Sequence, residues 1–151
     1  MIEIRPAAEE DLDWICALEE ENFALPWTRG QLANEIYREG AVLLTARLDG
    51  HCAGYMGMDY VLDEGYVTNV CTSSAHRRCG VAGALIDAML DKARGLGLSF
   101  VTLEVRVSNA PARALYAKKG FQEVGIRPGY YEKPREDAAI MTFYIDKGAE
   151  Q

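Results

Sequence analysis

The turn at residues 70–83 holds the residues best suited to bind an anion. It reads Val-Cys-Thr-Ser-Ser-Ala-His-Arg-Arg-Cys-Gly-Val-Ala-Gly and joins a predicted strand to a predicted helix. The first N–H groups of a helix are unpaired, the helix dipole adds positive potential, and small residues let an anion approach the backbone. The turn lacks the ending of a Walker A loop and the spacing of a G-x-G-x-x-G loop. It is therefore either a pyrophosphate site or a tight turn with two solvated arginines.

Two side chains downstream of this turn could move protons. Glu104 shares one face of a predicted strand with Phe100, Thr102 and Arg106. A carboxylate in such a run is either solvated or held in a pocket. Tyr116 lies on a short predicted helix, where a tyrosine usually packs against the core with its hydroxyl group at the rim. The residues alone leave both alternatives open.

The pattern of apolar residues predicts about seven strands and about four helices that would position these groups. The predicted strands cover residues 2–5, 41–48, 52–61, 65–72, 98–107, the segment after Gly120-Phe121, and residues 139–145. The predicted helices cover residues 9–21, a segment opened by Thr28 and Gln31, residues 81–94 and residues 111–119. Their order, β α α β β β α β α β β, predicts an α/β fold of the α+β sandwich type with a mixed central sheet. We expect one domain over residues 1–151.

The composition fits one hydrophobic core, and the charges are distributed unevenly. Of the 151 residues, 49% are hydrophobic, 26% are charged and 9% are aromatic, and the net charge is −7. Residues 1–40 hold ten acidic and three basic side chains, whereas residues 77–119 hold three acidic and eight basic ones. The overall sign disfavours nucleic-acid binding, and the two stretches indicate two unlike partners.

The residue types that bind metals are too few and too scattered to make a site. They are two histidines and four cysteines without C-x-x-C spacing: His51, His76, Cys16, Cys52, Cys71 and Cys79. We therefore expect reduced thiols and no metal. The chain has no basic and then apolar leader and no apolar run of about 18 residues, so we expect neither a signal peptide nor a membrane span. These features predict a cytoplasmic protein.

The segment Arg77-x-x-Gly80-x-Ala82 is similar to the Q/R-x-x-G-x-G/A signature of the GNAT family of N-acetyltransferases. Residues 103–109, 114–116 and 120–121 resemble later segments of the same family, in the same order. Within the family, residues 25–28, the spacing Arg127-x-x-Tyr130-Tyr131 and residues 135–138 are most similar to bacterial ribosomal-protein alanine N-acetyltransferases. The resemblance extends over nearly the whole chain.

The resemblance implies an acyl-CoA N-acyltransferase fold, in which acetyl-coenzyme A (acetyl-CoA) lies between two splayed parallel strands. The cofactor contacts that it implies are Val70, Cys71, Thr72, Arg78, Cys79, Gly80, Val81, Ala82, Gly83 and Asn109. Residues 78–83 would hold the pyrophosphate with backbone N–H groups, and residues 70–72 would face the pantetheine arm. The sequence departs from the family at Ala82, where glycine is common, and at Gly83, where relatives often carry a basic residue. We expect one phosphate contact to be weaker for that reason.

The resemblance also implies a catalytic pair. Glu104 matches the proton acceptor, which would act through water, and Tyr116 matches the general acid that protonates the leaving thiolate. A phenol with a pKa of about 10 and a thiol with a pKa of about 8.5 are close enough for such a transfer.

The acceptor is expected to be an N-terminal amine. An α-amino group has a pKa of about 7.7–8.0 against about 10.4 for lysine, so a larger share of it is neutral near pH 7. The resemblance implies the N-terminal alanine of a small-subunit ribosomal protein, and Glu19, Glu20 and Glu21 could attract its basic tail. Trp27, Tyr130 and Tyr131 could wall the acceptor slot, although Trp27 is equally a core candidate.

Two alternative functions share parts of this hypothesis. The first is a GNAT acetyltransferase that acts on lysine side chains or on a small amine. The second is a non-catalytic module that binds acyl-CoA. The presence of both Glu104 and Tyr116 argues against the second.

Overall fold

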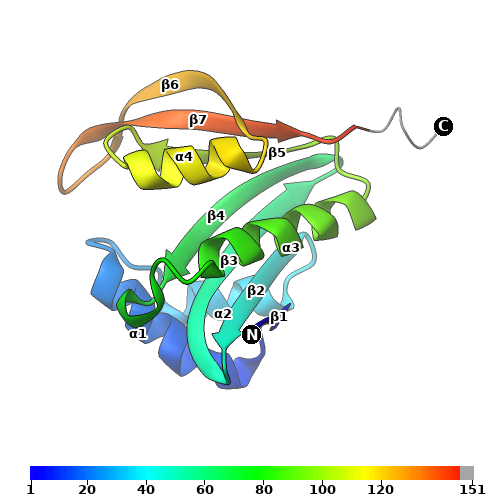
Figure 1. The fold of residues 1–151 in the computed structure, drawn as a ribbon, viewed down its shortest axis with the longest axis vertical. Coiled ribbons are helices and arrows are strands. Elements are labelled where there is room, and N and C mark those ends of the chain that lie inside the picture. Colours follow the sequence, from blue (N-terminus) through cyan, green and yellow to red (C-terminus); the bar gives the residue numbers. More distant parts are fainter. Residues whose placement is uncertain (147–151) are drawn as a thin grey trace.

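The chain folds into a seven-stranded sheet with helices on both faces, as a computed structural model that describes residues 1–146 shows (Figure 1). The strands are β1 (Ile2–Pro6), β2 (Ala41–Leu48), β3 (His51–Val61), β4 (Glu64–Thr72), β5 (Phe100–Arg106), β6 (Gln122–Tyr131) and β7 (Glu136–Tyr144). The helices are α1 (Leu12–Asn22), α2 (Arg29–Tyr37), α3 (Val81–Gly95) and α4 (Ala110–Lys118), with single 3₁₀ turns η1 (Glu9–Asp11) and η2 (Ser74–His76). The fold class predicted from the sequence is confirmed.

The strands lie in the order β1-β2-β3-β4-β5-β7-β6. Neighbouring strands are antiparallel except β4 and β5, which are parallel and are joined by the crossover through α3. The hairpin predicted from Asp49-Gly50 connects β2 and β3, and the predicted β-α-β unit is the one formed by β4, α3 and β5. In this topology β4, which leads into the turn at residues 73–80, is the neighbour of β5, which carries Glu104.

Two helical layers cover the sheet, and each has its own group of buried residues. Figure 1 shows α3 and α4 in front of the sheet and α1 and α2 behind it. The predicted stripe of α3 is buried in the front layer together with Val101, Leu103 and Val105 of β5. The back layer joins α1 and α2 to Tyr55 and Cys71 on β3 and β4. No helix of residues 1–146 has the length and hydropathy of a membrane span.

Two element boundaries differ from the prediction by three residues. Residues 9–11 form η1 instead of the first turn of α1, because the Asp11 carboxylate accepts the Ala8 N–H at 2.8 Å and an Arg47 N–H at 2.6 Å. Strand β7 begins at Glu136, three residues earlier than predicted, because Glu136 pairs with Tyr131 across the β6–β7 hairpin. A distant partner, Arg47, contributes to the first boundary, and pairing across a short hairpin decides the second.

The acid Glu35 on α2 is buried in the back layer, although acidic side chains normally face water. Its Oε1 atom lies 3.2 Å from Arg38, which also binds Asp59 of β3 at 2.8 Å. Burial, followed by the neighbouring Asp59 carboxylate, raises the pKa of Glu35 to about 7. A carboxyl group whose pKa is higher in the folded state binds its proton more tightly there. Its contribution to stability is therefore present at low pH and is lost as the pH rises to about 7.

We predict that Glu35→Gln raises the free energy of unfolding at pH 8 by about 1–3 kcal/mol, because the amide needs no proton to stay neutral. At pH 5 the variant and the wild type should unfold at nearly the same temperature. Thermal unfolding followed by circular dichroism at both pH values measures the difference. Glu39→Gln, at an exposed position two residues after α2, is the matched control and should show no such pH dependence. A variant less stable than the wild type at pH 8 would contradict the prediction.

Candidate active site

A long groove crosses the middle of the molecule where β4 and β5 separate. The two strands pair only from Glu64↔Phe100 to Tyr66↔Thr102, while β4 continues to Thr72 and β5 to Arg106. The groove has a volume of about 1700 Å³ and is lined by both strands, by the start of α3, by α4, by the segment between α1 and α2, and by the β6–β7 hairpin. Its walls therefore come from segments spread over most of the chain.

A bulge in β4 begins the separation. Gly57 of β3 pairs with Asn69 and Met58 pairs with Val67, so Thr68 is an extra residue in β4. A side chain at position 57 would put its Cβ atom 2.6 Å from Thr68 Oγ1, which explains the glycine there. Beyond the bulge, Val70–Thr72 pair with β3 on one side and line the groove on the other. Their backbone groups on that side are free for a ligand, as β4–β5 pairing ends at Tyr66.

The turn after β4 carries the predicted anion site. Gly80 precedes α3 with a φ of 83°, a left-handed conformation that suits glycine, and Arg78 also has a positive φ of 63°. Gly80, Val81, Ala82 and Gly83 line the groove at the first turn of α3, where N–H groups are unpaired. Both small residues of the signature lie at this turn.

The side chains of Arg77, Arg78 and Cys79, which directly precede Gly80, differ in position. Arg78 lines the groove. Arg77 also lines it but donates to Asn22 Oδ1 at 2.6 Å, which ties the turn to the end of α1. Cys79 is exposed, is absent from the groove wall, and its thiol contacts the Arg77 carbonyl oxygen at 3.6 Å.

The position of Gly83 has a feature that the sequence did not indicate. A Cβ atom on residue 83 would lie 3.4 Å from Cε and 3.6 Å from Nζ of Lys119, the residue that follows α4. Lys119 lines the groove and pairs with Asp87 at 2.9 Å. A cation from α4 thus occupies the space beside the first turn of α3 that a side chain at position 83 would enter.

Glu104 faces the groove from β5. Burial along β5 alternates as predicted, with Val101, Leu103 and Val105 buried and Glu104 partly exposed on the opposite face. The Glu104 side chain is 24% exposed, and its Oε1 atom lies 3.6 Å from Arg127 Nη2 on β6. Of the two alternatives left open by the sequence, the structure therefore favours a carboxylate held in a pocket.

Tyr116 lies on the opposite wall of the groove from β4, on α4. Its ring packs edge-on against Phe121 with 5.4 Å between centroids, and the side chain is buried. Burial raises the pKa of Tyr116, so the phenol is protonated near neutral pH. Asn109 also lines the groove, but its Oδ1 atom accepts the Ala112 N–H at 3.3 Å as the N-cap of α4.

Aromatic side chains line one part of the groove, which we call its aromatic end. Trp27 is only partly buried and comes from the segment between α1 and α2. Tyr130 and Tyr131 come from the end of β6, with 5.0 Å between their ring centroids. Arg127 lies over the Tyr130 ring and Arg106 over the Tyr131 ring, at 5.3 and 4.4 Å from the centroids. Burial raises the pKa of Tyr131 to about 12.

The predicted acidic lip is wrong for one of its three members. Glu19 is 1% exposed, accepts the Trp27 N–H at 2.8 Å and also contacts Tyr55 and Asn69. Glu21 accepts from the Ser74 hydroxyl group at 3.3 Å, and Glu20 is exposed. The prediction for these three residues rested on their charge alone. The helical period that put Ile15 and Leu18 in the core would also have put Glu19 near it.

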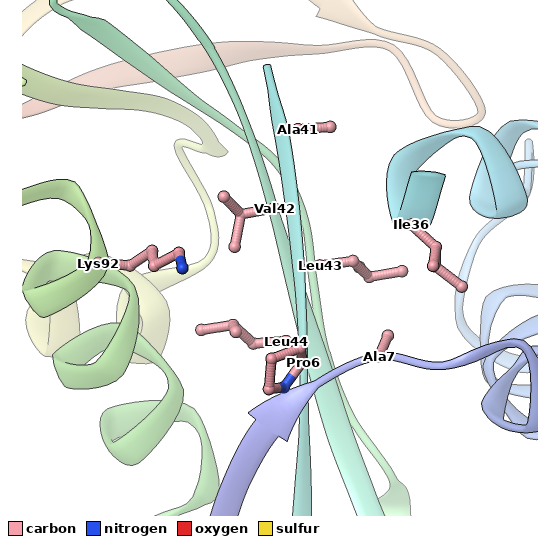
Figure 2. A pocket seen from close by; sticks show the side chains of 8 residues that line it. All are labelled: Pro6, Ala7, Ile36, Ala41, Val42, Leu43, Leu44 and Lys92. Atoms are coloured by element: carbon pink, nitrogen blue, oxygen red, sulfur yellow. The ribbon is translucent and has the colours of Figure 1, made fainter. Parts of the chain in front are cut away.

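A second, smaller pocket contains none of the predicted site residues. It has a volume of about 150 Å³ and lies beside β2 where β1 ends (Figure 2). Figure 2 shows Val42, Leu44 and Lys92 on one side of β2 and Leu43 and Ile36 on the other. Its lining is mostly aliphatic, so we assign the reaction to the groove.

Comparison with known proteins identifies the family of the chain. The acetyltransferase (GNAT) family matches residues 8–121. The [ribosomal protein bS18]-alanine N-acetyltransferase of Escherichia coli K12 is 34% identical over 139 residues, 89% of this chain and 92% of that protein. The enzyme of the same name from Haemophilus ducreyi is 31% identical over 147 residues, 94% of this chain and 99% of that protein.

A solved structure gives the same result in three dimensions. The crystal structure of the ribosomal-protein-S18-alanine N-acetyltransferase from Escherichia coli aligns with a TM-score of 0.88 and 32% identity, over 97% of this chain and 95% of that one. The signature turn, the splayed strands and these matches together show that the chain belongs to the GNAT family of acetyltransferases.

Proposed function

We propose that this protein transfers the acetyl group of acetyl-CoA to the N-terminal α-amino group of a protein, and that the acceptor is the N-terminal alanine of a small-subunit ribosomal protein. The observation that carries the proposal is that Glu104 and Tyr116 line the same groove as the first turn of α3. The names of relatives about one-third identical over most of the chain support the choice of acceptor. We assign the activity to one catalytic domain, residues 1–151, in the cytoplasm.

We assign one orientation to acetyl-CoA in the groove. We assign the pyrophosphate to residues 78–83, where N–H groups at the start of α3 and the Arg78 side chain can meet a dianion. Val70–Thr72 would bind the pantetheine arm with the backbone groups that β5 leaves unpaired. Asn109 would contact the arm at the start of α4, and Cys79 would contribute through its backbone N–H group.

Glu104 and Tyr116 have separate roles in the proposed reaction. The amine nitrogen attacks the thioester carbonyl carbon, a C–N bond forms and the C–S bond breaks. Glu104 receives the proton of the amine through water, and Tyr116 donates toward the sulfur that leaves as a thiolate. Because burial raises the pKa of Tyr116, a strong hydrogen bond to the sulfur is favoured over early and complete proton transfer.

The acceptor would enter from the aromatic end. Trp27, Tyr130 and Tyr131 line the groove together with Glu104. Burial, and then the nearby Glu104 carboxylate, raises the pKa of Tyr130, so Glu104 lies close to this aromatic group. An α-amino group, with a pKa of about 7.7–8.0, loses its proton to a carboxylate through water more easily than lysine does. This chemistry supports an N-terminal acceptor.

We predict that the protein acetylates a peptide with an N-terminal alanine and a basic tail, and leaves its lysine side chains unmodified. A panel of peptides that begin with Ala, Ser or Met, and an N-terminally blocked peptide that contains lysine, would be incubated with acetyl-CoA and analysed by mass spectrometry. Transfer only to lysine or to a small amine would reject the proposed acceptor. Acetyl-CoA binding without transfer to any amine would indicate a non-catalytic module.

We predict that Glu104→Gln lowers kcat about 100-fold and Tyr116→Phe lowers it about 10- to 100-fold, because each removes one proton-transfer group. The Kd for acetyl-CoA should stay within about threefold of the wild-type value in both variants, as neither residue is assigned to the phosphates. Steady-state kinetics and calorimetry measure the two quantities. Unchanged turnover in Glu104→Gln would remove it as the base. A large loss of affinity in Tyr116→Phe would make it a cofactor contact.

The missing side chain at position 83 gives a further prediction about phosphate binding. We predict that Lys119→Met weakens acetyl-CoA binding about tenfold, the value of one charge-assisted contact. Adding Gly83→Lys to that variant should restore the affinity, because the new side chain begins 3.6 Å from the position of the Lys119 Nζ atom and can supply an ammonium group beside the same turn. Lys92→Met, at an exposed position of α3, also removes one positive charge and is the matched control.

Calorimetry with coenzyme A and with dephospho-coenzyme A distinguishes the phosphates. The same loss for both ligands would assign Lys119 to the pyrophosphate, and a loss for coenzyme A alone would assign it to the 3′-phosphate. Unchanged affinity in Lys119→Met would contradict the prediction.

A further inference from the structure

The buried carboxylate of Glu19 has no part in the proton transfers proposed above, yet it lines the groove. It lies in the last turn of α1, at 1% exposure. Burying a charged carboxylate costs several kcal/mol unless hydrogen bonds compensate for the lost water. The hydrogen bonds of Glu19 therefore need to offset the free-energy cost of burying its carboxylate.

Three donors from three different elements converge on the carboxylate. Oε1 accepts the backbone N–H of Trp27 at 2.8 Å. Oε2 accepts the Tyr55 hydroxyl group of β3 and the Asn69 side-chain amide of β4, the latter at 3.3 Å. Burial and the Glu19 carboxylate raise the pKa of Tyr55, so the phenol is protonated and donates. Every partner is a donor, as an ionised carboxylate requires.

These contacts join the two sides of the groove. Asn69 is the β4 residue next to the bulge, directly before the strand segment assigned to the pantetheine arm. Trp27 ends the segment at residues 23–27, whose Phe23 and Leu25 are exposed apolar groups on the groove wall. The next residue, Thr28, caps α2 through Gln31, so the segment is held at this end as well. Glu19 thus links this wall directly to β4.

We propose that Glu19 is a positioning residue that sets the acceptor wall, residues 23–27, at a fixed distance from the cofactor strand β4. This inference rests on the proposed function, because it takes residues 23–27 as the acceptor side of the groove. It assigns to Glu19 an effect on the acceptor and none on the pyrophosphate, because the hydrogen-bond partners of Glu19 are Trp27, Tyr55 and Asn69 and none of them lies in residues 78–83. The proposal treats the carboxylate as a set of hydrogen-bond acceptors and gives it no proton to carry.

Glu19→Met and Glu19→Gln test this role. Methionine keeps the length of the side chain but accepts no strong hydrogen bond. Glutamine can still accept the Trp27 N–H, and its amide can donate to the phenol oxygen of Tyr55. We expect Glu19→Met to raise the KM for the acceptor peptide about tenfold, with the Kd for acetyl-CoA within about threefold of wild type. Glu19→Gln should return the KM to within about threefold, with an unchanged pH profile of kcat/KM.

Hydrogen exchange gives a readout that does not depend on catalysis. In Glu19→Met, backbone exchange should become faster at residues 23–28 and stay unchanged at residues 78–83. Tyr55→Phe removes one donor with little change in shape, and should give a smaller effect of the same kind if Glu19→Met does not fold. Glu10→Met and Glu10→Gln, at an exposed position in η1, are the matched controls.

The results separate this inference from the proposed function. Faster exchange at residues 23–28 in a protein that modifies another amine would keep the positioning role and reject the ribosomal acceptor. An unchanged KM and unchanged exchange in both Glu19→Met and Tyr55→Phe would overturn the positioning role. Glu19→Gln as damaged as Glu19→Met, with a shifted pH profile, would also overturn it, since Glu19 would then be a proton acceptor.

Discussion

The short pairing between β4 and β5 is the constraint on which the site depends. Backbone N–H and C=O groups inside a protein need partners, and in a continuous sheet the neighbouring strand supplies them. Here pairing stops at Tyr66↔Thr102, and the bulge at Thr68 bends β4 away. The last part of β4, Val70–Thr72, therefore has backbone donors and acceptors on one side that only a ligand or water can satisfy. An extended, amide-rich ligand such as a pantetheine arm has the matching groups.

The two helical layers contribute to the groove in different ways. Helix α3 is held by apolar burial, and its first turn is left free to face an anion. Helices α1 and α2 are held to the sheet in part by ionic contacts next to their ends, Asp11 of η1 with Arg47 of β2 and Arg38 after α2 with Asp59 of β3. Such contacts have stricter geometry than apolar packing, because each donor must meet its acceptor. Such contacts are suited to holding the acceptor wall, residues 23–27, at a fixed distance from β4.

The uneven charge of the chain is present at the surface but reaches the groove only in part. The basic stretch does supply Arg78 and Lys119 to the groove beside the first turn of α3. The acidic stretch, however, loses Glu19 and Glu35 to the interior, and Glu21 is bound to Ser74. Seven of its ten acidic side chains stay exposed, but none of these seven lines the groove. The aromatic groups at Trp27, Tyr130 and Tyr131 are the larger feature of the acceptor end.

The sequence determined whatever depends on local pattern. The periods of apolar residues predicted the strands and helices, Asp49-Gly50 predicted the hairpin, and the small residues at 80–83 predicted the anion turn, because each of these follows from near neighbours in the chain. The tertiary structure alone decided the contacts between distant segments. Glu19 meets Asn69 across 50 residues, and Lys119 reaches Gly83 from another helix. No local pattern encodes such contacts, because they exist only after the sheet has brought the segments together.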